Sequence, residues 1–374
     1  MALTKDLNNL IFKTNEPIIL KGCLKWQIFQ WDLDKWNDIL KHENLEFRCG
    51  VNDATKFPQW ERTTQMTTGK FEDLHKLSDP LKWLYFDYKY LNQWFMNAKE
   101  LRESINFKDL GLENVDVNQS TIWIGSNGAH TPCHIDTYGC NVVVQVLGRK
   151  RWLLFPFNEK LKPTRVPYEE SSVYSGLNFF SPNSVQDFED ISVCKIVTLN
   201  PGDVLIVPHK WWHYVENLEI SISINTWLPL PQDDKERINE CLVQMLVTSF
   251  TKDLDKEKQD IILNPNSDDL RNSSLDSGIT LFNNLVAHPL SRRAVEDRSF
   301  KFDLDILLNQ YKFIRKIENV SKENFRLFLE NQRNRFSSNC VDDDYSRSKL
   351  SVEKLIQAIT HPEVVNLIMN KILE

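Results

Sequence analysis

Residues 121–155 read TIWIGSNGAHTPCHIDTYGCNVVVQVLGRKRWLLF, and this stretch decides the fold. It is rich in β-branched and aromatic residues and is interrupted by turn-forming residues such as Gly148, a pattern typical of consecutive short strands. Successive side chains on a strand point to opposite faces of the sheet. We therefore expect His134 and Asp136 to share one face, with an imidazole beside a carboxylate, while Ile135 points to the other face.

A second histidine that could complete a site with His134 and Asp136 is His213, in the segment VPHKWWHYVEN. It follows a Pro-Gly-Asp turn at 201–203 and the apolar run 204–207. Two neutral imidazoles and one carboxylate form the ligand set of non-haem Fe(II) oxygenases, which leave the other metal positions open. A His-x-Asp sequence alone is more often a hydrogen-bonded surface pair, so the assignment depends on the surrounding residues.

The motifs around these residues resemble those of the JmjC family of 2-oxoglutarate oxygenases. The matching motifs are GAHTPCHIDTYGCN, GRKRW and PTRVPYEESSVYS, and the resemblance extends over residues 17–263. It implies a double-stranded β-helix, Fe(II) as the metal, and 2-oxoglutarate and molecular oxygen as cosubstrates. It also implies that His134, Asp136 and His213 bind the metal and serve as the catalytic residues.

The resemblance also implies residues for the cosubstrate. 2-Oxoglutarate chelates the metal through its 1-carboxylate and 2-oxo group, which leaves a distal carboxylate in need of a cation and hydrogen-bond donors. Strand alternation places Lys150 on one face and Arg149 with Arg151 on the other, and the resemblance selects Lys150. The alternative is that the three basic residues form a solvated strand end. The implied cosubstrate-binding residues are Thr131, Lys150, Asn141 and Asn225.

The remaining pattern predicts a mainly β protein with α elements. We expect a cupin/JmjC double-stranded β-helix, or jelly roll, with N-terminal α/β elements and a C-terminal helical region. A strand at 84–90 would place Tyr85 on the same face as Asp87, where it can line the cosubstrate pocket. An aromatic helical segment around Trp26, Trp31 and Trp36 is expected in the core. Further strands are expected at 17–24 (an edge strand), 45–50, 121–125, 142–155, 194–199, 203–208 and 220–228.

The composition changes after residue 227, where a DDKE capping signal at 233–236 begins an amphipathic helix. We therefore divide the chain into an oxygenase domain at 1–232 and a C-terminal helical region at 233–374. The apolar stripes of this region indicate ordinary helix packing or a homodimer interface through the C-terminal helices. A linker is expected at 264–278, and further helices at about 303–317, 321–332, 349–360 and 362–373.

The composition bounds the class of protein. The 374 residues are 41% hydrophobic, which is ample for a packed core, and the net charge of -7 argues against a nucleic-acid surface. Seven cysteines without a CxxC pair indicate neither a disulfide framework nor a zinc site. The opening residues lack the apolar core of a signal peptide, and no apolar run reaches the ~20 residues of a membrane span. We expect a cytoplasmic protein, with the nucleus as a second candidate compartment.

Two classes of function are consistent with these observations. The first is an Fe(II)- and 2-oxoglutarate-dependent dioxygenase that hydroxylates a protein or peptide side chain. Demethylation ranks below hydroxylation because no chromatin-reading module or zinc-ligand cluster is visible in the sequence, and RNA modification ranks third because of the acidic charge. The second class, which the resemblance also implies, is a cupin-like adaptor that binds small heat-shock proteins with little or no catalysis.

The segment 163–175, PTRVPYEESSVYS, is predicted to be a loop because of its prolines and serines. If this loop lies at the barrel mouth, Tyr168, Glu169 and Glu170 present an aromatic face beside two carboxylates, which favours a basic peptide substrate. The alternative is that the two glutamates only solvate the surface.

Overall fold

The computed structural model describes residues 2–77, 79–231, 233–264, 270, 274–288, 302–336 and 350–374. Most of the strands come from the first 228 residues, as the alternating pattern predicts. The strands are β1 (Ile18–Leu20), β2 (Leu45–Val51), β3 (Gln65–Gly69), β4 (Lys82–Tyr90), β5 (Thr121–Gly125), β6 (His130–Asp136), β7 (Cys140–Leu147), β8 (Lys150–Phe155), β9 (Pro163–Glu169), β10 (Ser172–Ser175), β11 (Lys195–Leu199), β12 (Val204–Val207), β13 (Trp212–Asn217), β14 (Ser221–Leu228) and β15 (Ile314–Lys316).

Helices flank these strands. Asp255 and Ser321 each cap a helix by accepting a hydrogen bond from a backbone N–H three residues on, and Pro362 opens the last helix, as expected. The α-helices are α1 (Ala2–Lys13), α2 (Leu33–Leu40), α3 (Leu91–Trp94), α4 (Lys99–Glu103), α5 (Asp233–Thr251), α6 (Lys256–Ile262), α8 (Leu275–Ala287), α9 (Leu304–Gln310), α10 (Lys322–Asn334), α11 (Leu350–Ile359) and α12 (Pro362–Leu373). The 3-10 helices are η1 (Gln27–Gln30), η2 (Glu61–Thr63), η3 (Phe71–Leu74), η4 (Phe107–Leu110), η5 (Val117–Gln119) and η6 (Val185–Phe188).

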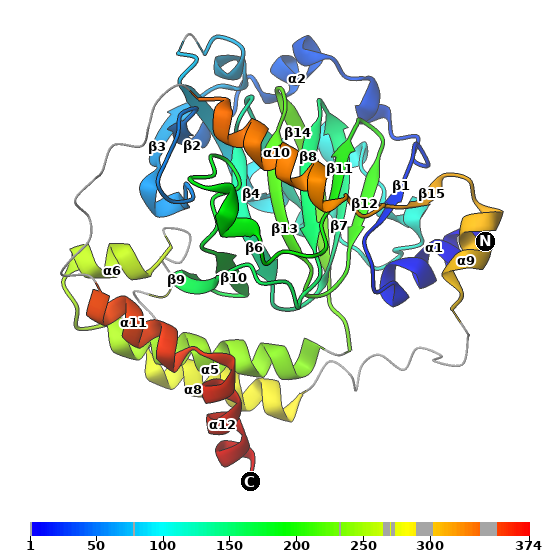
Figure 1. The fold of residues 1–374 in the computed structure, drawn as a ribbon. Helices are drawn as coiled ribbons and strands as arrows, with labels where there is room; N and C mark the ends of the chain where they lie inside the picture. Colours follow the sequence, from blue (N-terminus) through cyan, green and yellow to red (C-terminus); the bar gives the residue numbers. More distant parts are fainter. Residues whose placement is uncertain are drawn as a thin grey trace.

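Two antiparallel sheets face each other and form the expected double-stranded β-helix (Figure 1). Among the described residues, one sheet has the order β15-β1-β12-β7-β14-β5-β4-β2-β3, and the other has the order β11-β8-β13-β6-β10-β9. Apolar side chains from both sheets meet between them, among them Val143 of β7, Trp152 of β8 and Val207 of β12. Alternate residues of each strand therefore face the interior between the two sheets.

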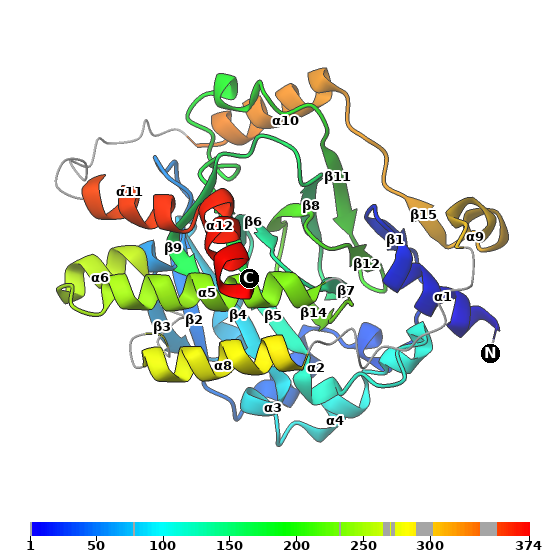
Figure 2. The same cartoon turned by 90° about the horizontal axis from the view of Figure 1, so that it is seen from below.

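The outer faces of the sheets are covered by helices. N-terminal elements pack on the nine-stranded sheet in a core that includes Trp26, Trp31 and Trp36, which confirms the prediction that these residues are buried. Helix α10 packs on the six-stranded sheet through Phe325 and Leu329. Seen from below, α10 lies on the side of β8 and β11, while α5 and α8 run side by side below the strands (Figure 2).

The structure corrects the prediction of a loop at 163–175. Residues of this segment form β9 and β10, which pair with each other, and β10 also pairs with β6. Prolines are tolerated here because β9 is the edge strand of its sheet. An edge strand pairs on one side only, so a backbone N–H that faces the other side is not needed for a hydrogen bond to a second strand. The segment therefore extends the six-stranded sheet beside the strand that carries His134.

The C-terminal region also differs from its prediction in several places. The helix expected at about 303–317 ends at Gln310, and β15 follows and pairs with β1, so the segment at 17–24 contains no edge strand. The expected linker at 264–278 overlaps α8, which Ser274 caps, while residues 265–269 and 271–273 lie outside the described residues. The helices expected at 321–332, 349–360 and 362–373 are confirmed as α10, α11 and α12.

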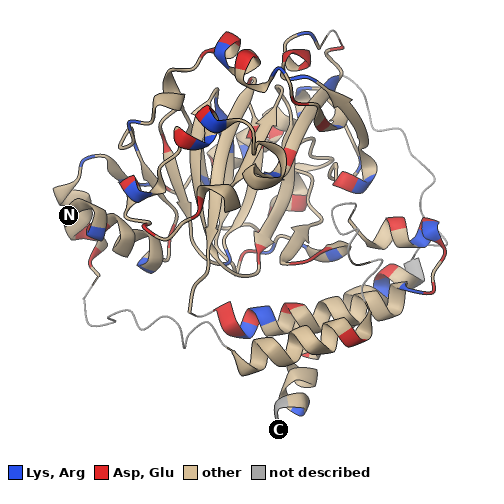
Figure 3. Ribbon diagram, turned by 180° about the vertical axis from the view of Figure 1, so that it is seen from behind, with Lys and Arg blue, Asp and Glu red and all other residues tan. Residues whose placement is uncertain are grey.

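The proposed boundary at residue 233 stays a prediction. Helices α5, α8, α11 and α12 share one apolar cluster with β9. In contrast, β15 pairs with β1 in the nine-stranded sheet, and α10 packs on the six-stranded sheet. Within the described ranges no helix has both the length and the apolar character needed to cross a membrane. In the ribbon coloured by charge, Lys and Arg positions and Asp and Glu positions are both scattered over strands and helices (Figure 3).

Candidate functional site

Two histidines and an aspartate meet on the inner face of the six-stranded sheet. His134 and Asp136 lie two residues apart on β6, and His213 on the antiparallel strand β13 is directly opposite His134. One potential ligand atom from each of the three residues lies within 4.8 Å of the other two, and His134 Nε2 is 3.6 Å from Asp136 Oδ1. The strand alternation expected from the sequence therefore brings these three side chains together.

Backbone carbonyls orient both imidazole rings. His134 Nδ1 lies 2.9 Å from the Pro132 carbonyl oxygen, and His213 Nδ1 lies 3.0 Å from the Trp211 carbonyl oxygen. Because a carbonyl oxygen only accepts, each Nδ1 carries the hydrogen in these bonds, and the lone pair is on Nε2. Each ring thus offers Nε2 as a metal ligand, in the manner of histidines whose second nitrogen is fixed by a hydrogen bond.

The surroundings favour the neutral, ligand-ready form of His134. Burial, and to a smaller extent the neighbouring His213, lower its pKa to about 4, although Asp136 acts in the opposite direction. The indole of Trp227 donates a 3.0 Å hydrogen bond to Asp136 Oδ2, which leaves Oδ1 as the oxygen nearest His134. The indole of Trp152 stacks on His213 with ring centroids 5.7 Å apart.

Lys150 reaches across the space between the sheets. It begins β8, is only 1% exposed, and donates hydrogen bonds to Ser223 Oγ at 2.8 Å and to Tyr85 Oη at 3.4 Å. Ser223 and Tyr85 belong to the nine-stranded sheet, so the lysine connects both sheets. Burial lowers the pKa of Lys150 to about 7, and Asp87 opposes this shift.

The two arginines beside Lys150 lie outside this space. Arg149 forms an exposed ion pair with Glu219 at 3.1 Å. The guanidinium of Arg151 lies over the ring of Phe328 in α10, 5.5 Å from its centroid, on the outer face of the sheet. Of the three basic residues, Lys150 is therefore the one whose ammonium points between the sheets.

The other residues of the implied cosubstrate site lie around Lys150. Asn225 donates a 2.8 Å hydrogen bond to Asn141 Oδ1 and accepts one from the Trp123 indole at 2.7 Å. Burial raises the pKa of Tyr85, which remains a neutral hydrogen-bonding hydroxyl, and a hydrogen bond with Thr131 opposes that shift. All of the residues implied for the cosubstrate thus come from strands that line the same interior.

The three residues expected to contact substrate, Tyr168, Glu169 and Glu170, do not lie on one common surface. Tyr168 is fully buried in the cluster beneath the C-terminal helices, with the Arg165 guanidinium 5.0 Å from its ring, so the expected exposed aromatic face is wrong. The cause is strand alternation, which turns Tyr168 and Glu169 to opposite faces of β9. Glu170 accepts a 2.6 Å hydrogen bond from the hydroxyl of Tyr138.

Glu169 alone of these residues faces the candidate metal site. It accepts hydrogen bonds from the Tyr174 hydroxyl and, at 2.6 Å, from the Asn264 amide. The Tyr174 ring is 6.0 Å from that of His134. Burial raises the pKa of Glu169, while the hydrogen bonds from Tyr174 and Asn264 oppose that shift.

Sequence reasoning missed several polar residues of the interior. Trp152 and Ser223 lie on the same strand faces as Lys150 and Asn225, and Asn217 lies four residues after His213, so strand parity was a signal that could have found all three. Trp227 shares the face of Asn225 for the same reason. Including every second residue along each strand from an assigned site residue would therefore have added these residues to the predicted site.

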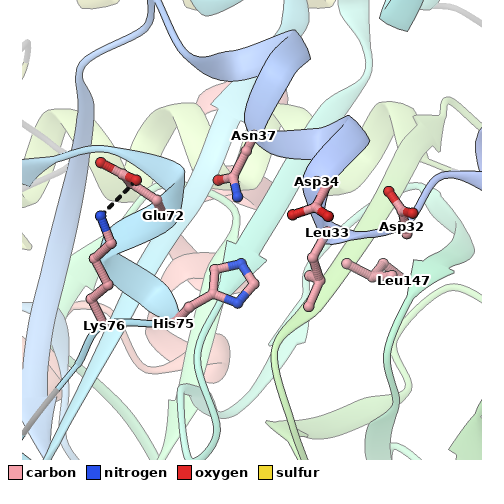
Figure 4. Close-up of a pocket in the computed structure, with 8 residues that line it drawn as sticks. All are labelled: Asp32, Leu33, Asp34, Asn37, Glu72, His75, Lys76 and Leu147. Carbon is pink, nitrogen blue, oxygen red and sulfur yellow. Dashed lines mark hydrogen bonds and ion pairs between the residues drawn. The ribbon is translucent and has the colours of Figure 1, made fainter.

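A separate hollow of about 600 Å³ lies on the outside of the molecule, beside α2 and η3 (Figure 4). Its lining includes Asn37 and His75, and Lys76 forms a 2.7 Å ion pair with Glu72 at its rim. None of the candidate metal or cosubstrate residues lines it.

Comparison with known proteins identifies relatives. Residues 5–233 match the family model described as a cupin-like domain. The chain is 38% identical over 280 residues to HSPB1-associated protein 1 of Homo sapiens, which covers 68% of this chain and 56% of that protein. It is 37% identical over 264 residues to the HSPB1-associated protein 1 homolog of Danio rerio, which covers 68% of this chain and 58% of that protein. The chain therefore spans little more than half the length of these relatives.

A more distant relative is lysine-specific demethylase 8 of Xenopus tropicalis, which is 32% identical over 227 residues and covers 57% of this chain and 48% of that protein. Among solved structures, E. coli ycfD is 17% identical with a TM-score of 0.38, covering 77% of this chain and 68% of that chain. Because the family model matches more than half of its residues, this chain belongs to the cupin-like family that includes the JmjC proteins.

Proposed function

We propose that this protein is an Fe(II)- and 2-oxoglutarate-dependent dioxygenase that hydroxylates a protein side chain. The observation that carries the proposal is the convergence of His134, Asp136 and His213 on one interior face that also contains the buried ammonium of Lys150. Two imidazoles and a carboxylate suit Fe(II), and a buried ammonium suits an anionic cosubstrate.

Buried polar atoms in the interior support this fit. The indole Nε1 of Trp152 and both side-chain polar atoms of Asn217 have no hydrogen-bond partner within the described protein. Such atoms are uncommon in folded proteins unless a ligand or solvent pairs with them. Their position on the same strand faces as Lys150 and His213 indicates that this interior is built to receive a polar molecule.

Each residue has a defined part in the proposed reaction. When bound, the iron and 2-oxoglutarate supply the oxidising chemistry through reaction with oxygen and release of succinate. His134, Asp136 and His213 would hold the metal, and the indole of Trp227 fixes the orientation of the carboxylate. Lys150 would hold the distal carboxylate, with Tyr85 and Ser223 positioning the ammonium.

Succinate formation tests the proposed function without knowledge of the substrate. Purified protein that is loaded anaerobically with Fe(II) should convert 2-oxoglutarate slowly to succinate once oxygen is admitted. Heat-denatured protein with the same iron is the control for free-metal chemistry. A metal-loaded protein that neither binds 2-oxoglutarate nor forms succinate contradicts the proposal and leaves the adaptor function.

That adaptor function is the second candidate. It is favoured by the names of the relatives, which are called HSPB1-associated proteins. We propose it as a role that could accompany catalysis, because a binding surface on the outer helices would leave the interior site free. A pull-down with purified small heat-shock protein, in the presence and absence of iron and 2-oxoglutarate, separates the two roles.

We expect the affinity for 2-oxoglutarate to fall as pH rises. The pKa of Lys150 is lowered to about 7 by burial, so its ammonium form decreases above that pH in the ligand-free protein. Because a carboxylate pairs with the ammonium form, binding should take up a proton, and affinity should fall about tenfold between about pH 6 and pH 8. Anaerobic calorimetry in two buffers of different ionisation enthalpy measures this uptake.

Metal binding in the same buffers, without cosubstrate, is the control for titration of the metal ligands. A Lys150→Arg variant provides a second control, because a guanidinium stays charged over this range and should remove the pH dependence that arises from Lys150. An affinity that is constant from about pH 6 to pH 8 in the wild-type protein contradicts a role for the Lys150 ammonium.

We also expect Glu169 to contribute to the choice of a basic substrate. Its carboxylate lies beside Tyr174, whose ring is near His134, so it can meet a cationic side chain at the metal site. Loss of one charge-assisted hydrogen bond corresponds to about tenfold weaker binding. Glu169→Gln should therefore reduce the stimulation of succinate formation by lysine- or arginine-containing peptides about tenfold.

The matched control is Glu219→Gln, which alters an exposed carboxylate paired with Arg149. Iron content, 2-oxoglutarate affinity and peptide-independent succinate formation should stay unchanged in both variants. If peptide stimulation is the same in Glu169→Gln and wild type, Glu169 has only a structural role at the end of β9.

A further inference from the structure

Asn217 has a buried side-chain amide that lacks a hydrogen-bond partner among the described residues. It ends β13, is 1% exposed, and neither Nδ2 nor Oδ1 has a hydrogen-bond partner within the described protein. Its backbone is fully engaged, since its N–H donates to Ala129 and its carbonyl accepts from Gly128, each at 2.9–3.0 Å. An amide that only completed the fold would be expected to pair with a neighbouring group, because an unpaired buried amide is destabilising.

The position of Asn217 places it beside Lys150. The two residues are directly opposite each other on the antiparallel pair β13 and β8, so their side chains share the inner face of the sheet. His213 and Val215 precede Asn217 at alternate positions on that face. The metal end of the interior and the lysine end are therefore joined by one row of side chains on β13.

Gly125 shows what the Asn217 amide is directed toward. A Cβ added at Gly125 would lie 2.6 Å from Asn217 Nδ2 and 2.7 Å from Tyr85 Cδ2. The amide and the tyrosine ring thus meet over a glycine that leaves them room. The Lys150 ammonium lies 5.3 Å from the centroid of the same tyrosine ring, so all of these groups line one end of the interior.

Other amides of the interior are engaged differently. Gln145 donates through Nε2 to the carbonyls of Leu147 and Gly148, and therefore braces the turn after β7. Asn225 both donates to Asn141 and accepts from Trp123. The side chain of Asn217 makes neither kind of hydrogen bond with the described residues, so its Nδ2 hydrogens remain available to a ligand.

We propose that Asn217 is a further cosubstrate-binding residue, whose Nδ2 donates a hydrogen bond to the distal carboxylate that Lys150 holds. The ligand class is a 2-oxo dicarboxylate whose chelating end is at the metal and whose far carboxylate reaches this end of the interior. The inference rests on the proposed function. It adds a residue that makes the site selective for a cosubstrate with a carboxylate at this distance from the chelating end.

The test uses the full chain loaded with Fe(II) under anaerobic conditions. Binding of 2-oxoglutarate is titrated by calorimetry to wild type, Asn217→Ala and Asn217→Asp, and the thermal melting temperature of each ligand-free protein is recorded. Pyruvate, a 2-oxo acid without a distal carboxylate, is titrated in parallel. Asn178→Ala is the structural comparator, because Asn178 is also buried but its amide is paired with Thr55, Phe57 and Ser181.

We expect Asn217→Ala to bind 2-oxoglutarate about tenfold more weakly, with an unchanged affinity for pyruvate and a melting temperature no lower than that of wild type. The affinity of Asn217→Asp for 2-oxoglutarate should be about a hundredfold lower than that of wild type, because the new carboxylate repels the ligand and competes for Lys150. Asn178→Ala should show the reverse pattern, with a lower melting temperature and wild-type affinity.

Two results would overturn the inference, and they are distinguishable. If wild type binds 2-oxoglutarate and both Asn217 variants bind it equally well, Asn217 is not a cosubstrate residue, and the proposed function stands. If metal-loaded wild type binds no 2-oxoglutarate at all, the proposed function fails and this inference fails with it.

Discussion

Replacing Asp136 with alanine is expected to abolish stoichiometric Fe(II) binding while the barrel stays folded. The change removes the carboxylate oxygen that lies 3.6 Å from His134 Nε2 and leaves, among the described residues of the candidate site, the two imidazoles. Because the loss of even an outer-shell partner weakens metal binding by about 10- to 100-fold, the loss of a ligand should exceed that range. Anaerobic metal analysis after desalting measures the effect.

The fold should tolerate this change because Asp136 is only half-buried and loses one hydrogen bond to a described residue, that from the Trp227 indole. The loss of one hydrogen bond corresponds to about 1 kcal/mol, which lowers the melting temperature by a few degrees at most. Glu219→Ala, at an exposed ion pair, is the control and should retain full iron. Full iron occupancy in Asp136→Ala would exclude this residue as a ligand, and Asp136→Gly would repeat the test with the same missing carboxylate.

The part of the site that the sequence could predict is the part that strand alternation determines. A period of two residues places His134 beside Asp136 and separates Lys150 from its flanking arginines, and the structure has these side chains on the faces that the period requires. The family resemblance indicated which of the two faces binds the metal and the cosubstrate. Neither strand alternation nor the resemblance depends on which strands pair with each other.

The errors arose where neighbours matter. The segment 163–175 has the composition of a loop, yet it is extended because β10 pairs with β6, a contact between distant parts of the chain. Residues 314–316 continue a helical pattern but form a strand because β1 offers an unpaired edge. Long-range pairing of this kind overrides local preference, and one sequence contains no direct signal for it.

The same limitation explains why Tyr168 was assigned to the wrong surface. In a loop, the neighbouring side chains Tyr168 and Glu169 could both face a substrate, but in a strand they face opposite sides. The structure buries Tyr168 beneath the C-terminal helices and leaves Glu169 beside Tyr174. A correct assignment of the strand would therefore have corrected the substrate prediction as well.

Replacing Lys150 with alanine is expected to weaken 2-oxoglutarate binding by about ten- to a hundredfold, because a charge-assisted pair with a buried carboxylate contributes roughly 1.5 to 3 kcal/mol. Lys150 is 1% exposed, and its hydrogen bonds with described residues go to the hydroxyls of Ser223 and Tyr85, so a carboxylate can still pair with its ammonium. Anaerobic titration of the Fe(II)-loaded variant measures the loss. Iron content should stay at the wild-type level, since Lys150 is not among the metal ligands.

Arg149→Ala and Arg151→Ala are the matched controls, because they remove a neighbouring positive charge from the other face of the same strand. Arg149 pairs with Glu219 at the surface, and Arg151 lies against Phe328 of α10, so neither variant should change the affinity for 2-oxoglutarate. A large loss in either arginine variant, with wild-type affinity in Lys150→Ala, would mean that the cosubstrate binds outside the space between the sheets. In that case the buried lysine would be a structural link between Tyr85 and Ser223, and the interior would need another ligand.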